Sequence, residues 1–127
     1  MPATNISACR VLLVDDDPLV CDSIRRMLEF DRHNVQVAHS AAEALAICEQ
    51  QSFDLVILDY MMPVMKGDQL AARLKERFPD RPVIMITADA EKVESPGAKP
   101  SGVDLIVGKP FRLEDLREAV SNALLKT

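Results

Sequence analysis

The stretch VLLVDDDP, residues 11–18, joins an apolar run of strand length to three aspartates and a proline. The apolar run ends abruptly at Asp15. Asp17 belongs to the residue types that cap helices, and Pro18 suits the first position of a helix. Apolar residues then recur at helical spacing up to residue 32. The stretch therefore predicts a strand, an acidic turn and a helix over 18–32.

The same alternation continues along the chain. Further apolar runs of strand length occupy residues 35–38, 55–58, 83–86 and 105–107. Helical patterns run from the capping-box sequence SAAE at 40–43 to about residue 51, from 67 to about 78, and from 113 onward. Strands that alternate with helices pair in parallel through right-handed crossovers.

The predicted fold class is therefore α/β, a doubly wound five-stranded parallel sheet with the flavodoxin-like order 2-1-3-4-5. One segment departs from the pattern. Residues 96–102 contain two prolines and two glycines, which disfavour a helix. We expect the fourth helix to be short or irregular, with at most a turn or two over 89–95.

Composition narrows the function classes. The 127 residues suit one domain, which we expect over 9–127 behind a flexible N-terminal tail, 1–8. A net charge of −5 argues against direct nucleic-acid binding. No signal peptide or apolar run of about 20 residues is visible, so we expect a cytoplasmic protein without a membrane partner. The three cysteines lack metal-ligand spacing and are expected to be small buried or half-buried hydrophobes.

Polar residues follow the strands at the edge where such sheets bind ligands. Asp15 and Asp16 follow the first strand, Asp59 the third, Thr87 the fourth and Lys109 the fifth. Three clustered carboxylates repel one another unless a cation intervenes. Mg²⁺ is the natural cation, because it takes one or two carboxylates and shares the rest of its shell with water and phosphate oxygens.

Such a pocket suits phosphoryl transfer. A carboxylate can act as a nucleophile and form an aspartyl phosphate. Mg²⁺, the Lys109 ammonium, the Thr87 hydroxyl and the Ala88 backbone N–H would serve the phosphoryl oxygens. Taken singly, each residue has a plain structural interpretation as a helix cap, a strand end or a solvated lysine. Their joint placement at four strand ends favours the functional interpretation.

Four stretches carry a family resemblance: LLVDDDP at 12–18, LDYMMPVMKG at 58–67, MITA at 85–88 and KPF at 109–111. In this order they resemble the signature stretches of the receiver domain of two-component response regulators, over about residues 9–126. The resemblance implies that Asp59 is the phosphoacceptor. It further implies that Asp16, Asp59 and the Met61 carbonyl ligate Mg²⁺, with Asp15 acting through water.

The resemblance also implies roles around the phosphoryl group. Thr87 would be the switch hydroxyl, Lys109 would pair with the phosphoryl oxygens, and the Lys109–Pro110 bond would be cis. The phosphodonor would be a phosphohistidine on a sensor histidine kinase or a histidine phosphotransfer protein. That partner is expected to dock near Leu19, Pro110 and Phe111. A downstream effector domain or protein would receive the signal.

Two features depart from the family pattern. Ile106 stands where the family usually has an aromatic residue that swings inward with the threonine. The segment 96–102 stands where the family has its fourth helix. We hypothesise that the domain signals by ordering or displacing residues 89–103, or through another face.

Three alternatives stay open. The chain could be a receiver-like module that binds a partner without being phosphorylated. It could be a Mg²⁺-dependent hydrolase, since Asp15 and Asp17 have the required spacing, although Asp59 would then be unexplained. A flavin-binding protein would need a phosphate loop that the first strand lacks. The leading hypothesis is a phosphorylation switch that is not an enzyme, apart from slow self-dephosphorylation.

Overall fold

The computed structural model describes residues 8–62, 64–88 and 102–125. This part of the chain holds five strands, β1 (Arg10–Val14), β2 (Asn34–Ala38), β3 (Leu55–Asp59), β4 (Val83–Thr87) and β5 (Leu105–Gly108). It also holds four helices, α1 (Pro18–Phe30), α2 (Ala41–Gln50), α3 (Gly67–Arg77) and α5 (Leu113–Leu125). The predictions of an N-terminal tail and of an irregular segment at 89–101 fall on residues outside these ranges, apart from Ala8.

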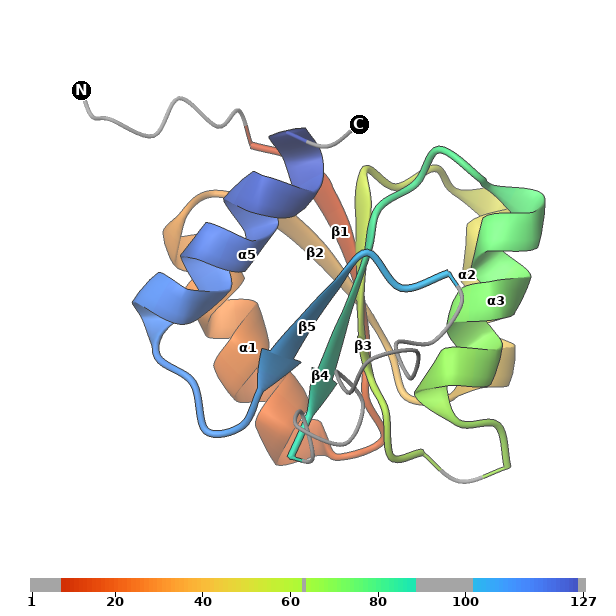
Figure 1. Ribbon diagram of the computed structural model, residues 1–127, viewed down its shortest axis with the longest axis horizontal. Coiled ribbons are helices and arrows are strands. Elements are labelled where there is room, and N and C mark those ends of the chain that lie inside the picture. The colour runs from red at the N-terminus through yellow and green to blue at the C-terminus, as the bar shows by residue number, and fades with distance from the viewer. Residues whose placement is uncertain (1–7, 63, 89–101, 126–127) are drawn as a thin grey trace.

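The five strands form one parallel sheet in the order β2-β1-β3-β4-β5 (Figure 1), which confirms the predicted fold class. The register aligns Leu13 with Ile57 and Ile57 with Ile84 across the three central strands. β3 and β4 are buried over their whole length. Runs that are apolar on both faces suit central strands with helices on each side.

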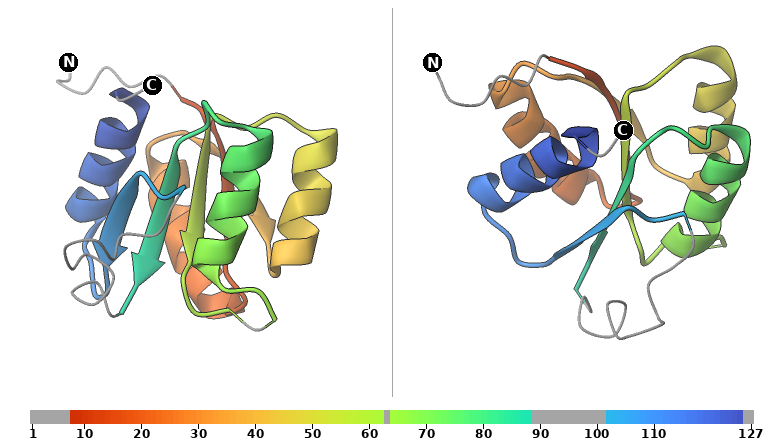
Figure 2. Two further views of the ribbon diagram at one scale, coloured as in Figure 1. Left: turned by 45° about the vertical axis from the view of Figure 1, so that its right-hand side comes forward. Right: turned by 45° about the horizontal axis from the view of Figure 1, so that its top comes forward.

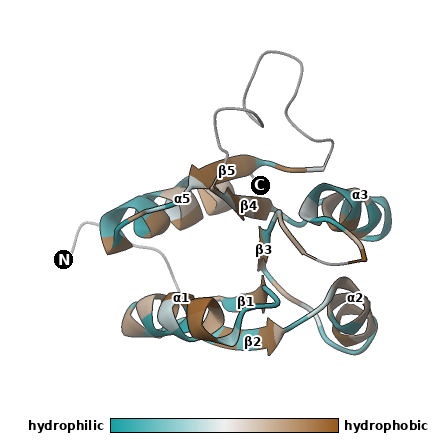
Figure 3. Ribbon diagram, turned by 90° about the horizontal axis from the view of Figure 1, so that it is seen from below, coloured by the Kyte–Doolittle hydropathy of each residue, from teal (hydrophilic) through white to brown (hydrophobic). Residues whose placement is uncertain are grey.

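The helices cover the sheet in two pairs. α1 and α5 lie on one face, and α2 and α3 on the other (Figures 2 and 3). Alternate strand residues point to opposite faces, so Leu13 packs under α1 and α5 whereas Leu12 packs under α2 and α3. The sheet therefore separates two hydrophobic clusters, named here the α1/α5 core and the α2/α3 core.

Helix α1 begins as predicted and ends earlier than predicted. The Asp17 carboxylate accepts the Leu19 N–H at 2.9 Å and caps the helix. The helix stops at Phe30, not at residue 32, because Arg32 adopts a positive φ of 68°. The Arg32 N–H then donates to the Glu29 carbonyl at 2.9 Å and the His33 N–H to the Leu28 carbonyl at 3.2 Å. These bonds form a Schellman motif, which satisfies the last carbonyls of the helix.

Helix α2 shows half of the predicted capping box. The Ser40 hydroxyl accepts the Glu43 N–H at 3.1 Å, as expected. The Glu43 carboxylate, however, accepts the N–H of His39 at 2.7 Å instead of that of Ser40. The start of α2 is thereby tied to the residue that follows β2.

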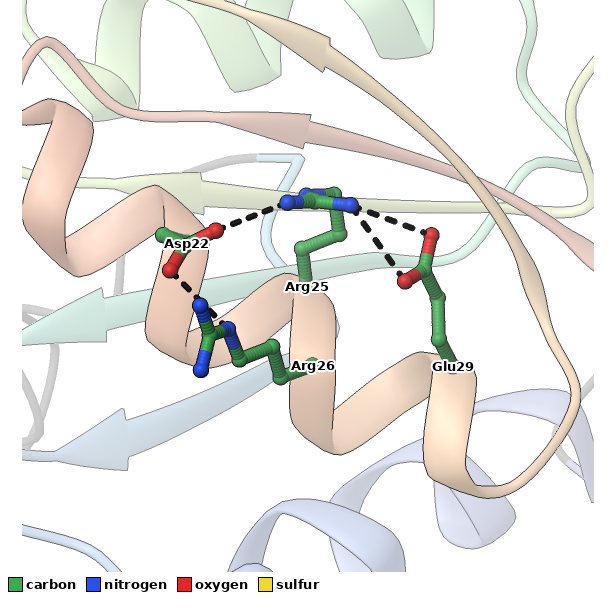
Figure 4. A network of polar contacts seen from close by, with 4 residues as sticks. All are labelled: Asp22, Arg25, Arg26 and Glu29. Carbon is green, nitrogen blue, oxygen red and sulfur yellow. Dashed lines mark hydrogen bonds and ion pairs between the residues drawn. The ribbon is translucent and has the colours of Figure 1, made fainter.

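An ion-pair network lies along the outer side of α1 (Figure 4). Arg25 pairs with Asp22 at 2.7 Å and with Glu29 at 3.3 Å, and Arg26 pairs with Asp22 at 3.0 Å. Pairs spaced three or four residues apart each stabilise a helix by about 0.2–0.5 kcal/mol. The network supports α1 modestly and leaves its opposite face free to pack on the sheet.

The cysteines and the helices of the described residues bear on two further sequence predictions. All three cysteines are free, with Cys21 and Cys48 buried and Cys9 partly buried, as expected. Burial raises the pKa of the Cys21 thiol to about 11, so this thiol stays protonated at neutral pH. Across the described ranges, the structure contains no helix with both the length and the apolarity needed to cross a bilayer.

Candidate functional site

Three aspartates meet at the carboxyl edge of the sheet. The register aligns Val14 with Leu58, so Asp15 and Asp59 leave their neighbouring strands side by side. One carboxylate oxygen from each of Asp15, Asp16 and Asp59 lies within 4.8 Å of the others. Asp15 and Asp59 are buried, whereas Asp16 is exposed. The structure thus brings together the acidic residues that the sequence predicted, with one side of the cluster open to solvent.

Lys109 adds a positive charge to this cluster. Its Nζ lies 3.4 Å from the Asp59 Oδ1. The Lys109 backbone N–H donates to the Thr87 carbonyl at 2.8 Å, which continues the β4–β5 pairing past the end of β5. The Lys109–Pro110 peptide bond is cis, as predicted. Lys109 is therefore placed by the sheet itself, next to the Asp59 carboxylate.

The other predicted site residues surround Asp59. Thr87 is buried at the end of β4 and Ala88 is exposed directly after it. The Asp59–Ile86 register places both beside the end of β3. Met61 has an exposed side chain, and its backbone hydrogen-bonds to the Asp59 carboxylate. Predicted ligands of a phosphoryl group and of a metal ion therefore share one edge.

Burial and mutual repulsion shift the acids of the cluster. Burial, reinforced by the charges of Asp59 and Asp16, raises the pKa of Asp15 from 3.8 to about 6. The Asp17 N–H, which donates to the Asp15 carboxylate at 2.9 Å, and the Lys109 charge oppose this rise. Burial also raises the pKa of Asp59, again against the effect of Lys109. One lysine does not balance the cluster, so these oxygens suit a hard divalent cation.

Gly67 allows α3 to start directly against the site. A Cβ atom at this position would lie 2.5 Å from the Asp59 carbonyl oxygen and 2.8 Å from the Tyr60 Cα. The Gly67 N–H also donates to the Tyr60 carbonyl at 2.9 Å. The loop after β3 therefore closes tightly, and only glycine fits where it meets the backbone of Asp59.

Two residues at this edge were missed by sequence reasoning. The Cys21 thiol and the His39 ring nitrogen Nδ1 each lie 3.2 Å from the Asp15 carbonyl oxygen. The site predicted from the sequence is lined only by the ends of strands one, three, four and five. The order 2-1-3-4-5 also places the end of β2, and hence His39, beside Asp15. That neighbourhood is the available signal for His39, whereas the sequence around Cys21 predicts only a small hydrophobe.

A groove beside the acid cluster gathers the predicted docking residues. It has a volume of about 620 Å³ and is bordered by α1, Ala88 and the loop after β5. Leu19, Pro110 and Phe111 all line it, and so does Lys109. Leu19 exposes 81% of its surface, which is unusual for a leucine in a folded domain. A protein bound in this groove would lie within reach of the acid cluster.

Ile106, the residue at the altered switch position, lies in β5 and pairs with Met85 of β4. It is partly buried and packs against the α2/α3 core. The hypothesis that residues 89–103 carry the signal falls mostly on residues outside the described ranges.

Known proteins resemble this chain in both sequence and fold. The sequence model described as "Response regulator receiver domain" matches residues 11–121. Response regulator MprA of Mycobacterium avium is 35% identical over 118 residues, which are 93% of this chain and 52% of MprA. Sensor histidine kinase AruS of Pseudomonas aeruginosa is 35% identical over 123 residues, covering 94% of this chain and 12% of AruS. The chain thus spans about half the length of the response regulators it matches.

Solved structures agree with these matches. A response regulator receiver domain protein from Clostridium thermocellum superposes with a TM-score of 0.84 at 30% identity, covering 94% of this chain and 96% of that one. Response regulator TrrA from Thermotoga maritima, solved in complex with Mg²⁺ and BeF, has a TM-score of 0.83 at 30% identity. That alignment covers 91% of this chain and 98% of TrrA.

Proposed function

This chain belongs to the response regulator receiver domain family, and from that premise we propose that Asp59 accepts a phosphoryl group from a histidine of a signalling partner. The observation that carries the proposal is the position of the Asp59 carboxylate. It lies among Asp15, Asp16 and Lys109 at the ligand-binding edge of the sheet. Receiver domains are signalling domains, and we propose slow self-dephosphorylation as the only catalysis here.

Each residue of the site would have a separate role in the phosphoryl transfer. An Asp59 carboxylate oxygen attacks the phosphorus atom, a P–O bond forms and the P–N bond to the donor imidazole breaks. The released imidazole nitrogen takes up a proton. The Lys109 ammonium, the Thr87 hydroxyl and the Ala88 N–H would bind the phosphoryl oxygens.

The acid cluster fits a Mg²⁺ ion in its donor chemistry, because carboxylate oxygens gather there with an excess of negative charge. We propose Asp16, Asp59 and the Met61 carbonyl as its ligands, with Asp15 acting through water. When bound, Mg²⁺ would neutralise charge on the carboxylates and on the phosphoryl oxygens. TrrA, solved with Mg²⁺ and BeF, supports this assignment by similarity.

The groove formed by Leu19, Pro110 and Phe111 is the proposed docking site for the phosphodonor. A sensor histidine kinase or a histidine phosphotransfer protein would supply the phosphohistidine. The match to part of AruS, which is named a sensor histidine kinase, supports a partner of this class. An effector domain or protein would receive the signal, and the greater length of MprA is consistent with this.

Intact mass after incubation with acetyl phosphate and Mg²⁺ tests the proposal. The wild type should gain one phosphoryl group, and Asp59→Asn should gain none. Asp80→Asn, which removes a carboxylate from an exposed turn, is the matched control and should behave as the wild type. If the wild type gains no phosphoryl group and also fails to bind beryllofluoride, the proposal is wrong. A phosphorylation-independent binding module would then be favoured.

A further inference from the structure

The carbonyl oxygen of Asp15 is held by two side chains. The Cys21 thiol donates to it at 3.2 Å, and the His39 Nδ1 lies at the same distance. A carbonyl oxygen only accepts hydrogen bonds, so the proton of the neutral His39 ring belongs on Nδ1. The two donor atoms are 3.9 Å apart and converge on one oxygen. Because a carbonyl oxygen has two lone pairs, its accepting capacity is filled.

Two further polar groups of Asp15 also make hydrogen bonds. Its backbone N–H donates to the Ala38 carbonyl at 3.1 Å, and its Oδ1 accepts the Asp17 N–H at 2.9 Å. The peptide plane between Asp15 and Asp16 contains the carbonyl that Cys21 and His39 hold. Its orientation determines where the Asp16 Cα lies and hence the direction of the exposed carboxylate of Asp16.

The two donors are themselves anchored from different helices. Cys21 is 3% exposed in the α1/α5 core. The His39 backbone N–H donates to Glu43 at the start of α2, at 2.7 Å. β2, which ends just before His39, lies beside β1 (Figure 3). The acidic turn after β1 is therefore clamped from α1 on one side and from the β2–α2 junction on the other.

We propose that Cys21 and His39 are positioning residues of the acid cluster. Acting through the Asp15 carbonyl, they hold the Asp15–Asp16 peptide so that both carboxylates converge with that of Asp59 on one divalent cation. This inference rests on the proposed function, since it assumes that the cluster binds Mg²⁺. Groups that orient metal ligands typically change metal affinity or activity by about 10- to 100-fold when they are removed.

Paired substitutions distinguish positioning from packing. Cys21→Ala removes the donor, whereas Cys21→Ser keeps a donor at the same place. His39→Ala removes the second donor, whereas His39→Asn keeps an N–H the same number of bonds from Cβ. Isothermal titration of each metal-free protein with MgCl₂ should show binding about tenfold weaker for the two alanine variants. The serine and asparagine variants should bind Mg²⁺ about as tightly as the wild type does.

A role in packing alone predicts the opposite order at Cys21. A buried serine would then be worse tolerated than alanine, because a hydroxyl is costlier than a methyl group in an apolar core. His39 is exposed, so His39→Ala should fold, and urea unfolding verifies this for every variant. The amide ¹⁵N shift of Asp16, measured without metal, should move in both alanine variants and little in the other two.

The outcomes separate this inference from the proposed function. If the wild type binds Mg²⁺ and the alanine variants bind it equally well, the positioning role is refuted and the metal site stands. Mg²⁺ affinity that falls further in Cys21→Ser than in Cys21→Ala would refute it as well. If the wild type itself does not bind Mg²⁺, the proposed metal site and the positioning role both fail.

Discussion

Replacing Asp15 by asparagine should stabilise the metal-free protein. Asp15 is 2% exposed and its carboxylate lies beside those of Asp16 and Asp59. Asparagine has nearly the same shape, keeps an oxygen that can accept the Asp17 N–H, and removes one negative charge from the cluster. The substitution therefore relieves repulsion without creating a cavity.

The size of the effect follows from the pKa of Asp15, which rises from 3.8 to about 6 in the fold. Each pKa unit corresponds to about 1.4 kcal/mol, so ionising a fully sequestered carboxyl of this kind would cost about 3 kcal/mol. Solvent reaches the cluster on the side of Asp16, which is exposed. Screening lowers the expected gain in unfolding free energy to about 1–2 kcal/mol at pH 7.5.

The sign of the pH dependence is also fixed. A carboxyl whose pKa is raised by folding favours the folded state when it is protonated, so its cost appears as pH rises from about 4 to about 6. The advantage of Asp15→Asn should therefore be small at pH 4 and complete above about pH 6.5. Saturating Mg²⁺ should reduce the advantage, because the cation would screen the repulsion and favour the wild type.

Urea unfolding in EDTA at pH 4.5 and pH 7.5 measures these differences, with Asp17→Asn as the control. Asp17 also carries a negative charge on this turn, but its side chain is exposed and outside the cluster. Asparagine caps a helix as well as aspartate does, so the control should match the wild type. If Asp15→Asn is no more stable than the control at pH 7.5, the repulsion argument is wrong.

Three further predictions concern other parts of the fold. Burial lowers the pKa of His33, against the nearby charge of Asp31, and its Nδ1 accepts the Cys9 N–H at 3.2 Å. The free energy of unfolding should therefore fall as pH drops below about 6.5, and His33→Asn should weaken this pH dependence. Urea unfolding that shows the same pH dependence for both proteins would contradict the prediction. Gly67→Ala should lower the free energy of unfolding by about 2 kcal/mol, because the new Cβ would lie 2.5 Å from the Asp59 carbonyl oxygen. A variant as stable as the wild type in urea would contradict this. Val64 is fully exposed and has a φ of 70°, which strains a β-branched residue. Val64→Asn should therefore add about 1 kcal/mol to the free energy of unfolding and raise the thermal midpoint. An unchanged or lower midpoint would argue against strain.

The sheet and the main site could be predicted from the sequence, because both depend on the local pattern of apolar residues and on the strand order. Apolar runs that stop at Asp15, Asp59 and Thr87 mark strand ends, and parallel pairing carries those ends to one edge. The cis bond before Pro110 and the grouping of the docking residues came from family resemblance instead. These features would not have followed from periodicity alone.

The features that escaped prediction depend on tertiary neighbours. The end of α1 at Phe30 depends on the left-handed backbone of Arg32, a residue type that does not favour that conformation. The Glu43 carboxylate accepts the N–H of His39, and not that of Ser40, because the chain that leaves β2 turns into α2 at this point. The hydrogen bond from the Cys21 thiol to the Asp15 carbonyl depends on how α1 packs against the turn that precedes it. Spacing along the sequence carries no signal for such contacts.

The division of the interior by the sheet has an evolutionary consequence. The two cores share only the backbone of the strands, since neighbouring strand residues such as Leu12 and Leu13 belong to opposite cores. The proposed docking groove is built on the α1/α5 side, where Ile24 and Met27 line it. Mutations that retune partner choice can therefore accumulate on that side while the α2/α3 core keeps its packing. A duplicated gene could diverge toward a new partner in this way without rebuilding its whole interior.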